Sequence, residues 1–255
     1  LLEIGGKGLF TLELEQALLE KRVDAAVHSL KDLPTDKVPG LVVDVIPQRA
    51  DSHDVWICPA GHTVDQIPAG SLVGTSSTRR KAQLLAYRPD FEIAPIRGNV
   101  DTRVRKVVEG QYDAIVLAAA GVTRLGLMEY ITQPLPMGIM APAPGQGALA
   151  IQCRADDVET LELLQILNHY ATHQAVIAER AFLAALGGGC SLPVGAYANL
   201  KGKIITLLGV IAAPDGGRVL KLSGHGEEAH ILGEQLAREA LAQGAADLLT
   251  HDVDG

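Results

Sequence analysis

The stretch SLVGTSSTRRKAQLLA at residues 71–86 determines the fold class, because it predicts a short buried strand that ends in a polar turn and leads into a capped helix. The apolar start is the strand, and the helix covers residues 78–86. The same pattern repeats downstream, with strands at residues 92–96 and 114–119 and a helix at 102–108. Such alternation is typical of a mainly parallel sheet with helices on its faces. This part of the chain therefore predicts an α/β fold.

The flanking regions predict two further units. Upstream lie a helix at residues 11–19 and strands at 23–27, 41–46 and 55–58. A proline-rich stretch at 134–144 precedes a strand at 148–153, and we interpret it as a linker that returns the chain to the first unit. Beyond that strand, helices are predicted at 158–167 and 172–186, strands at 194–200, 204–210 and 218–222, and a last helix at 229–242. Short turns join these last strands, which indicates a small α+β domain with an antiparallel sheet.

Composition excludes several classes of protein. The 255 residues, 47% of them hydrophobic, can form two or three compact units. A net charge of -8 argues against a nucleic-acid partner, which favours basic proteins. No apolar run approaches the ~18 residues of a membrane span. Three cysteines do not form a disulfide framework, so we expect a reducing compartment and a cytoplasmic protein.

Arginines follow the predicted strands at the carboxyl ends, where open α/β sheets bind ligands. Arg79 and Arg80 lie in the first turn of a helix that Ser76 or Ser77 can cap. The positive helix N-terminus disfavours cations there, so a bound carboxylate or phosphate would explain them. The same arrangement recurs downstream at Arg97, Arg103 and Arg124. The alternative is that these arginines are solvated surface charges.

Other candidates are weaker. His169 and His173 have the i, i+4 spacing of zinc ligands but lack a third ligand, and no metal site is expected. Cys58 and Cys153 lie in apolar strands and are interpreted as core thiols. Cys190 follows three glycines at a helix end, where the sulfur has space beside it, although a lone cysteine is commonly a small buried hydrophobe.

Several motifs together resemble the porphobilinogen deaminase (hydroxymethylbilane synthase) family. They run in family order along the chain: GGKGLF at 5–10, VHSLKDLP at 27–34, GTSSTRR at 74–80, RGNVDTR at 97–103, YDAIVLAAAGVTRLGL at 112–127, PAPGQGALAIQCR at 142–154 and GGGCSLPVG at 187–195. The resemblance implies two domains similar to type-2 periplasmic binding proteins and a small C-terminal α+β domain with a three-stranded antiparallel sheet. We place domain 1 at residues 1–47 and 148–168, domain 2 at 48–147 and domain 3 at 169–255.

The resemblance also implies the chemistry. The family condenses four porphobilinogen molecules into hydroxymethylbilane and releases ammonia at each step, on a dipyrromethane primer bound to the cysteine that matches Cys190. Asp32 matches the catalytic aspartate. The positions implied to hold the cofactor are Ser29, Lys31, Asp32, Thr75, Ser76, Arg79, Arg80, Arg97, Gly98, Gly189 and Cys190. The positions implied to hold the substrate are Lys7, in a loop near the site, Arg97, Arg103, Arg124 and Gln146.

Two expectations complete this interpretation. Family members precede the first residue with a strand and a helix that carry an Arg-x-Ser motif, so the N-terminal part of domain 1 is expected to be missing here. We expect a monomer with no nucleic-acid or membrane partner. The alternative function is a non-catalytic two-domain carboxylate-binding or ligand-sensing protein, for which the loop Cys190 and the strand-end Asp32 would have no use.

Overall fold

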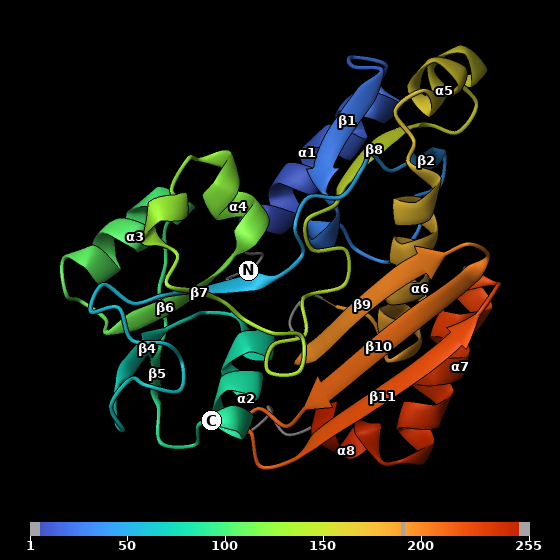
Figure 1. The fold of residues 1–255 in the computed structure, drawn as a ribbon. Helices are drawn as coiled ribbons and strands as arrows, with labels where there is room; N and C mark the ends of the chain where they lie inside the picture. Colours follow the sequence, from blue (N-terminus) through green and yellow to red (C-terminus); the bar gives the residue numbers. More distant parts are fainter. Residues whose placement is uncertain (1–5, 190–191, 250–255) are drawn as a thin grey trace, which may run out of the picture.

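The computed structural model describes residues 6–189 and 192–249, with side chains from residue 11 onward. Within these residues the strands form three sheets, which we call sheets A, B and C. Sheet A lies at the top of the view in Figure 1, sheet B at the left and sheet C at the right. The α/β class is confirmed.

Sheet A has the strand order β1-β8-β2, and both pairs are antiparallel. Its strands are β1 (Ala25–Ser29), β2 (Leu41–Val45) and β8 (Leu149–Arg154). Helix α1 (Gly6–Leu19) packs against all three, and α5 (Val158–Gln165) follows β8. Pairing of Val27 with Ile151 and of Val42 with Cys153 confirms that the chain returns to its first strands after the proline-rich linker.

Sheet B has the order β5-β4-β6-β3-β7 and apolar cores on both faces. Its elements are β3 (Asp54–Ile57), β4 (Leu72–Gly74), α2 (Thr78–Tyr87), β5 (Glu92–Ala94), α3 (Val100–Val108), β6 (Ala114–Ala118) and β7 (Gln133–Pro134). Only β5, β4 and β6 are parallel, so the predicted mainly parallel sheet is in fact mixed. The chain enters β3 from sheet A at the edge where β6 ends, which makes β3 antiparallel to β6 and pairs Asp54 with Ala118.

Two segments connect sheets A and B, at residues 46–53 and 135–148, and they lie side by side. The amide of Ala50 donates to the carbonyl oxygen of Gly147 over 3.0 Å. Gly147 has a φ of 83°, and a Cβ there would lie 2.6 Å from the carbonyl oxygen of Ala50. Glycine is therefore required for the two segments to approach this closely.

Sheet C is antiparallel in the order β11-β10-β9, which confirms the predicted three-stranded C-terminal sheet. Its strands are β9 (Val194–Lys201), β10 (Ile204–Ala212) and β11 (Val219–Gly226). Helices α6 (Tyr170–Ala185) and α7 (Ala229–Ala242) cover one face (Figure 1). Phe182 on α6 is fully buried against Gly209 of β10, where a Cβ would lie only 2.5 Å from the ring.

Most predicted elements are present, with ends that differ by a few residues. The helix at 229–242 has the predicted bounds, whereas α6 begins two residues early. The sequence did not predict five short elements: η1 (Leu30–Asp32), α4 (Ala119–Arg124), η2 (Met128–Tyr130), β7 and α8 (Ala245–Leu249). They are too short to show a hydrophobic period.

Candidate active site

The carboxyl edge of sheet B gathers the arginine-bearing segments. Gly74 at the end of β4 pairs in parallel with Ala94 of β5 and with Ile115 of β6, so the segments after these strands start from one edge. The arginines predicted at strand ends therefore follow the same edge of one sheet. Ser77, rather than Ser76, caps α2, since its side chain accepts from the amide of Arg80.

Arg79 and Arg80 are buried, so they are not solvated surface charges. Both bind Asp54, the first residue of β3: Arg79 Nη1 lies 2.7 Å from Asp54 Oδ2, and Arg80 Nη2 lies 2.7 Å from Asp54 Oδ1. Burial alone would raise the pKa of Asp54, but the two guanidinium groups hold that pKa well below its ordinary range. The carboxylate of Asp54 thus offsets the charges of the two arginines at the start of α2. A bound ligand is not needed to explain why two cations lie there.

Gln146 connects this ion-pair cluster to Lys31, which lies in η1 directly after β1. The fully buried Gln146 amide donates from Nε2 to Asp54 Oδ1 over 3.0 Å, and its Oε1 lies 3.4 Å from Lys31 Nζ. Desolvation, and then the nearby charge of Arg80, lower the pKa of Lys31 to about 8. One polar network thus joins η1, which follows β1 of sheet A, to β3 of sheet B and to α2.

A cavity of about 350 Å³ adjoins Lys31. Its wall includes residues 33–36 after η1, Arg180 and Leu183 of α6, and Gly187–Gly189 beyond the helix end. Arg180 donates to the carbonyl oxygens of Leu33, at 2.8 Å, and Pro34, at 2.6 Å, so α6 holds the segment that follows Asp32. Cys190 comes next after this wall but lies outside the described residues.

The remaining predicted site residues are more dispersed. Gly189 lines the cavity, and Ser29 ends β1 next to η1. Thr75 is buried, and Ser76 Oγ donates to the carbonyl oxygen of Ile96, which joins the segments after β4 and β5. Arg103 donates from Nε to the carbonyl oxygen of Gly98 over 2.7 Å. Burial, and then the charge of Arg80, lower the pKa of Arg103, so its guanidinium is near that of Arg80.

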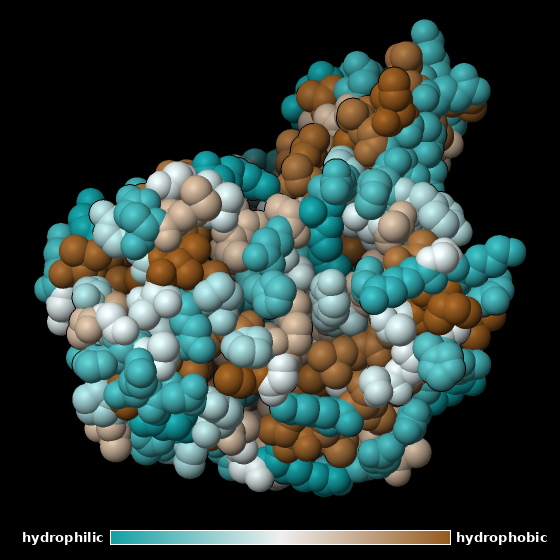
Figure 2. Space-filling view, in the orientation of Figure 1, coloured by the Kyte–Doolittle hydropathy of each residue, from teal (hydrophilic) through white to brown (hydrophobic). Residues whose placement is uncertain are grey.

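Arg97 and Arg124 are both exposed. Among the described residues, no hydrogen bond or ion pair joins either side chain to the Lys31 network. Lys7 lies in the first turn of α1 and not in a loop, and its side chain is outside the described part. Figure 2 shows a notch between the part of the molecule built on sheet A and the part built on sheet B, with both hydrophilic and hydrophobic atoms at its margin.

Sequence reasoning missed two buried carboxylates. Asp54 is a charged residue at the start of the otherwise apolar strand DVWI, and that mismatch could have indicated a partner. Glu179 lies on the buried face of α6 and pairs with Arg49, whose Nη1 is 2.7 Å from Glu179 Oε1. A glutamate within the apolar pattern of that helix was the available signal.

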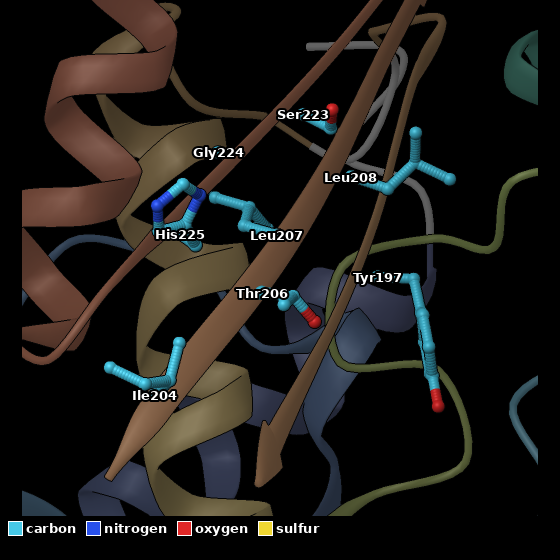
Figure 3. A pocket seen from close by; sticks show the side chains of 8 residues that line it. All are labelled: Tyr197, Ile204, Thr206, Leu207, Leu208, Ser223, Gly224 and His225. Carbon is cyan, nitrogen blue, oxygen red and sulfur yellow. The ribbon is translucent and has the colours of Figure 1, made fainter.

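A second cavity, of about 370 Å³, lies over the strands of sheet C (Figure 3). Its wall includes Tyr197, Thr206, Leu208 and Ser223 and holds none of the predicted site residues.

Cys58 and Cys153 are buried and reduced, which confirms that they are core thiols. No group of three or more potential metal ligands occurs in the part of the chain that the structure describes.

Comparison with known proteins supplies the family. Residues 1–162 match the family model described as "Porphobilinogen deaminase, dipyromethane cofactor binding domain", and residues 173–242 match "Porphobilinogen deaminase, C-terminal domain". The chain belongs to the porphobilinogen deaminase family. Porphobilinogen deaminase from Brevibacillus brevis is 52% identical over 98% of this chain and 81% of its own length. That from Desulforudis audaxviator is 49% identical over 98% of this chain and 82% of its own length.

Membership of the porphobilinogen deaminase family makes the chain a transferase with a dipyrromethane cofactor and favours the enzyme over the non-catalytic alternative. Among solved structures, a putative periplasmic sulfonate-binding protein from Methylobacillus flagellatus has 14% identity and a TM-score of 0.39, over 69% of this chain and 52% of that one. Similarity at this level does not bear on the ligand. In the described residues, every helix is too short or too polar to cross a membrane.

Proposed function

We propose that this chain joins four porphobilinogen molecules into hydroxymethylbilane, with Lys31, Asp32, Arg79 and Arg80 at the reaction centre. The observation that supports this best is the network from Lys31 through Gln146 and Asp54 to the two arginines, beside a cavity that ends at Gly189. The substrate carries two carboxylates, and each added unit brings two more. A cluster of cations around one internal carboxylate matches that requirement.

The chemistry of these residues fits the cofactor. The cavity volume is within the roughly 300–1,000 Å³ of small-molecule sites, and its wall joins cationic side chains to a glycine segment directly before Cys190. When bound, the dipyrromethane supplies the pyrrole position to which the first substrate is joined. We assign Ser29, Lys31, Thr75, Ser76, Arg79, Arg80, Arg97, Gly98 and Gly189 to holding it, with Cys190 as the point of attachment.

Asp32 is assigned the catalytic role. It lies in η1 and is only partly buried, so it can reach a ligand in the site. Loss of ammonia from porphobilinogen leaves a cation delocalised onto the pyrrole nitrogen. A carboxylate beside that N–H accepts its hydrogen bond and opposes the developing charge. The same group can pass protons to the leaving amine and from the newly joined ring.

We assign the substrate and the growing product to Lys7, Arg97, Arg103 and Arg124. Gln146, which was also predicted to hold substrate, is fully buried and bonds to Asp54 and Lys31 instead. Arg103 supports this assignment best, because it is half-buried close to Arg80. Arg97 and Arg124 are exposed at the same sheet edge, where a longer product would have space.

The domain limits at residues 47, 147 and 168 are also proposals, as are a monomeric state and a cytoplasmic location. Sedimentation of the purified protein tests the monomer.

Two variants test the function. Protein from a haem-making host is expected to weigh more than its sequence by two pyrrole units, and Cys190→Ala is expected to remove that increment. Asp32→Asn keeps the shape and removes the charge, so single-turnover release of ammonia is expected to fall at least about a hundredfold. Asp32→Glu retains the charge and is the milder control. A folded, cofactor-loaded Asp32→Asn protein that keeps more than a tenth of the wild-type rate would disprove the catalytic role.

A further inference from the structure

Asp54 is the centre of the polar network but faces no solvent. Its side chain is fully buried, and four hydrogen bonds reach its two oxygens. Oδ2 accepts from Arg79 at 2.7 Å, whereas Oδ1 accepts from Arg80 at 2.7 and 3.1 Å and from Gln146 at 3.0 Å. A buried carboxylate is costly unless it is paired in this way.

The orientation of the Gln146 amide depends on Asp54. Nε2 donates to two acceptors, the carbonyl oxygen of Ser52 at 2.8 Å and Asp54 Oδ1 at 3.0 Å. These two bonds leave Oε1 directed toward Lys31 Nζ at 3.4 Å. The carboxylate of Asp54 therefore orients cations in two helices: Arg79 and Arg80 of α2 directly, and Lys31 of η1 through an amide.

We propose that Asp54 is a positioning residue, which fixes Arg79, Arg80 and Lys31 as one array for the carboxylates of the cofactor and the product. The proposal rests on the proposed function. Lys31, Arg79 and Arg80 are three cations beside two anions, Asp54 and Asp32, so a net positive charge remains that can attract carboxylates. Asp54 also holds the two guanidinium groups side by side, although their charges repel each other.

The remaining bonds of the arginines support this role. Arg80 donates from Nη1 to the carbonyl oxygen of Val116 at 3.0 Å, and Arg79 donates from Nη1 to that of Ala141 at 2.6 Å. Each guanidinium is thus fixed by Asp54 and by one backbone carbonyl. Without the carboxylate, each arginine keeps one neutral acceptor and can follow a substrate carboxylate instead of presenting a fixed partner to it. Binding then survives, but the geometry that reaction requires is lost.

The first test is Asp54→Asn in cofactor-loaded protein, verified by intact mass. We expect kcat to fall roughly 10- to 100-fold, as displaced binding groups usually cause, while KM changes much less. Mass spectrometry is expected to show enzyme-bound intermediates accumulating. A wild-type kcat, or a loss of thermal stability alone, would mean that Asp54 is only a structural ion pair. If wild-type protein releases no ammonia from porphobilinogen, the proposed function fails instead.

The second test measures Lys31 without turnover. Acetic anhydride labels only neutral amines, so peptide mapping over a pH series gives the Lys31 titration midpoint. Among the described side chains, the charges that act most strongly on Lys31 are those of Asp32, Asp54, Arg79 and Arg80. Asp54→Asn removes one of the two anions, so the midpoint is expected to move to lower pH, with exposed Lys203 as the internal reference. An unchanged midpoint would overturn the proposal.

Two further variants test the proposal even if the Asp54→Asn protein does not fold. Asp54→Glu keeps the charge and is expected to hold the Lys31 midpoint near that of wild type even where kcat falls. Gln146→Met leaves the two ion pairs but removes the amide between Asp54 and Lys31. It is expected to lower kcat and to leave the cofactor attached. Wild-type kcat in Gln146→Met would contradict the part of the proposal that concerns Lys31.

Discussion

Glu179→Gln is predicted to destabilise the protein strongly, because Glu179 joins the two segments that connect sheets A and B to a strand of sheet C. The residue is fully buried on α6. Its Oε1 accepts from Arg49 Nη1 at 2.7 Å and from the Ala198 amide at 2.8 Å. Its Oε2 accepts from Arg49 Nη2 at 2.9 Å and from the Gly145 amide at 2.7 Å. Arg49 and Gly145 lie in the two segments that connect sheets A and B, and Ala198 lies in β9.

The magnitude follows from these four bonds. Glutamine has one oxygen and one NH₂ group, so in either orientation the NH₂ faces a backbone N–H and an arginine N–H. The buried charge of Arg49 also loses its counter-charge. Removing one partner of a buried pair costs about 3–5 kcal/mol. At roughly 2–4 °C per kcal/mol for a chain of this size, Tm is expected to fall by about 6–20 °C.

Circular dichroism melts measure this shift, on samples whose cofactor content is matched by intact mass. The exposed pair of Arg22 and Glu20 offers the control, and Glu20→Gln is expected to leave Tm unchanged. The double variant Arg49→Met with Glu179→Leu removes both buried charges but leaves the amides of Gly145 and Ala198 without an acceptor, so it is expected to recover only part of the loss. A Glu179→Gln protein that melts within about 2 °C of wild type would refute the reasoning.

Two further predictions concern the site and the core. Lys31 binds carboxylates in its charged form, which predominates below its pKa of about 8. Because Lys31 is assigned to the bound cofactor, kcat is therefore expected to fall as pH increases through about 8, and Lys31→Arg is expected to move that fall to higher pH in steady-state kinetics. Gly209→Ala places a Cβ against the buried ring of Phe182. Such overpacking costs about 1–3 kcal/mol, which thermal denaturation detects; an unchanged Tm would mean that the ring moves aside.

Much of the fold could be predicted from the sequence, because hydrophobic period and turn residues act locally. The alternation between residues 71 and 119 located the central strands and helices of sheet B. Strand direction could not be predicted in the same way. The reversal of β3 depends on where the chain enters from sheet A, which is a long-range property.

The site shows the same division between local and long-range information. The arginine positions were visible as local patterns at strand ends, whereas Lys31 and Asp32 were located by the family resemblance. The residues that bind these cations could not be predicted in this way. Along the sequence, Asp54 is separated from Arg79 by a strand and a long turn, and Gln146 is separated from Lys31 by most of two sheets. A buried ion pair depends on tertiary packing, so a charge within an apolar strand is the only trace of it in sequence. The roles of Asp32 and Cys190 came from the family resemblance.

The two bonds from Arg180 to the segment after Asp32 have a consequence for a polymerising enzyme. Arg180 belongs to α6, which ends at Ala185, and its side chain binds the segment directly after the proposed catalytic Asp32. On the proposed function, this segment is held to α6 while the product grows. Each added pyrrole ring therefore has to find its space away from Arg180.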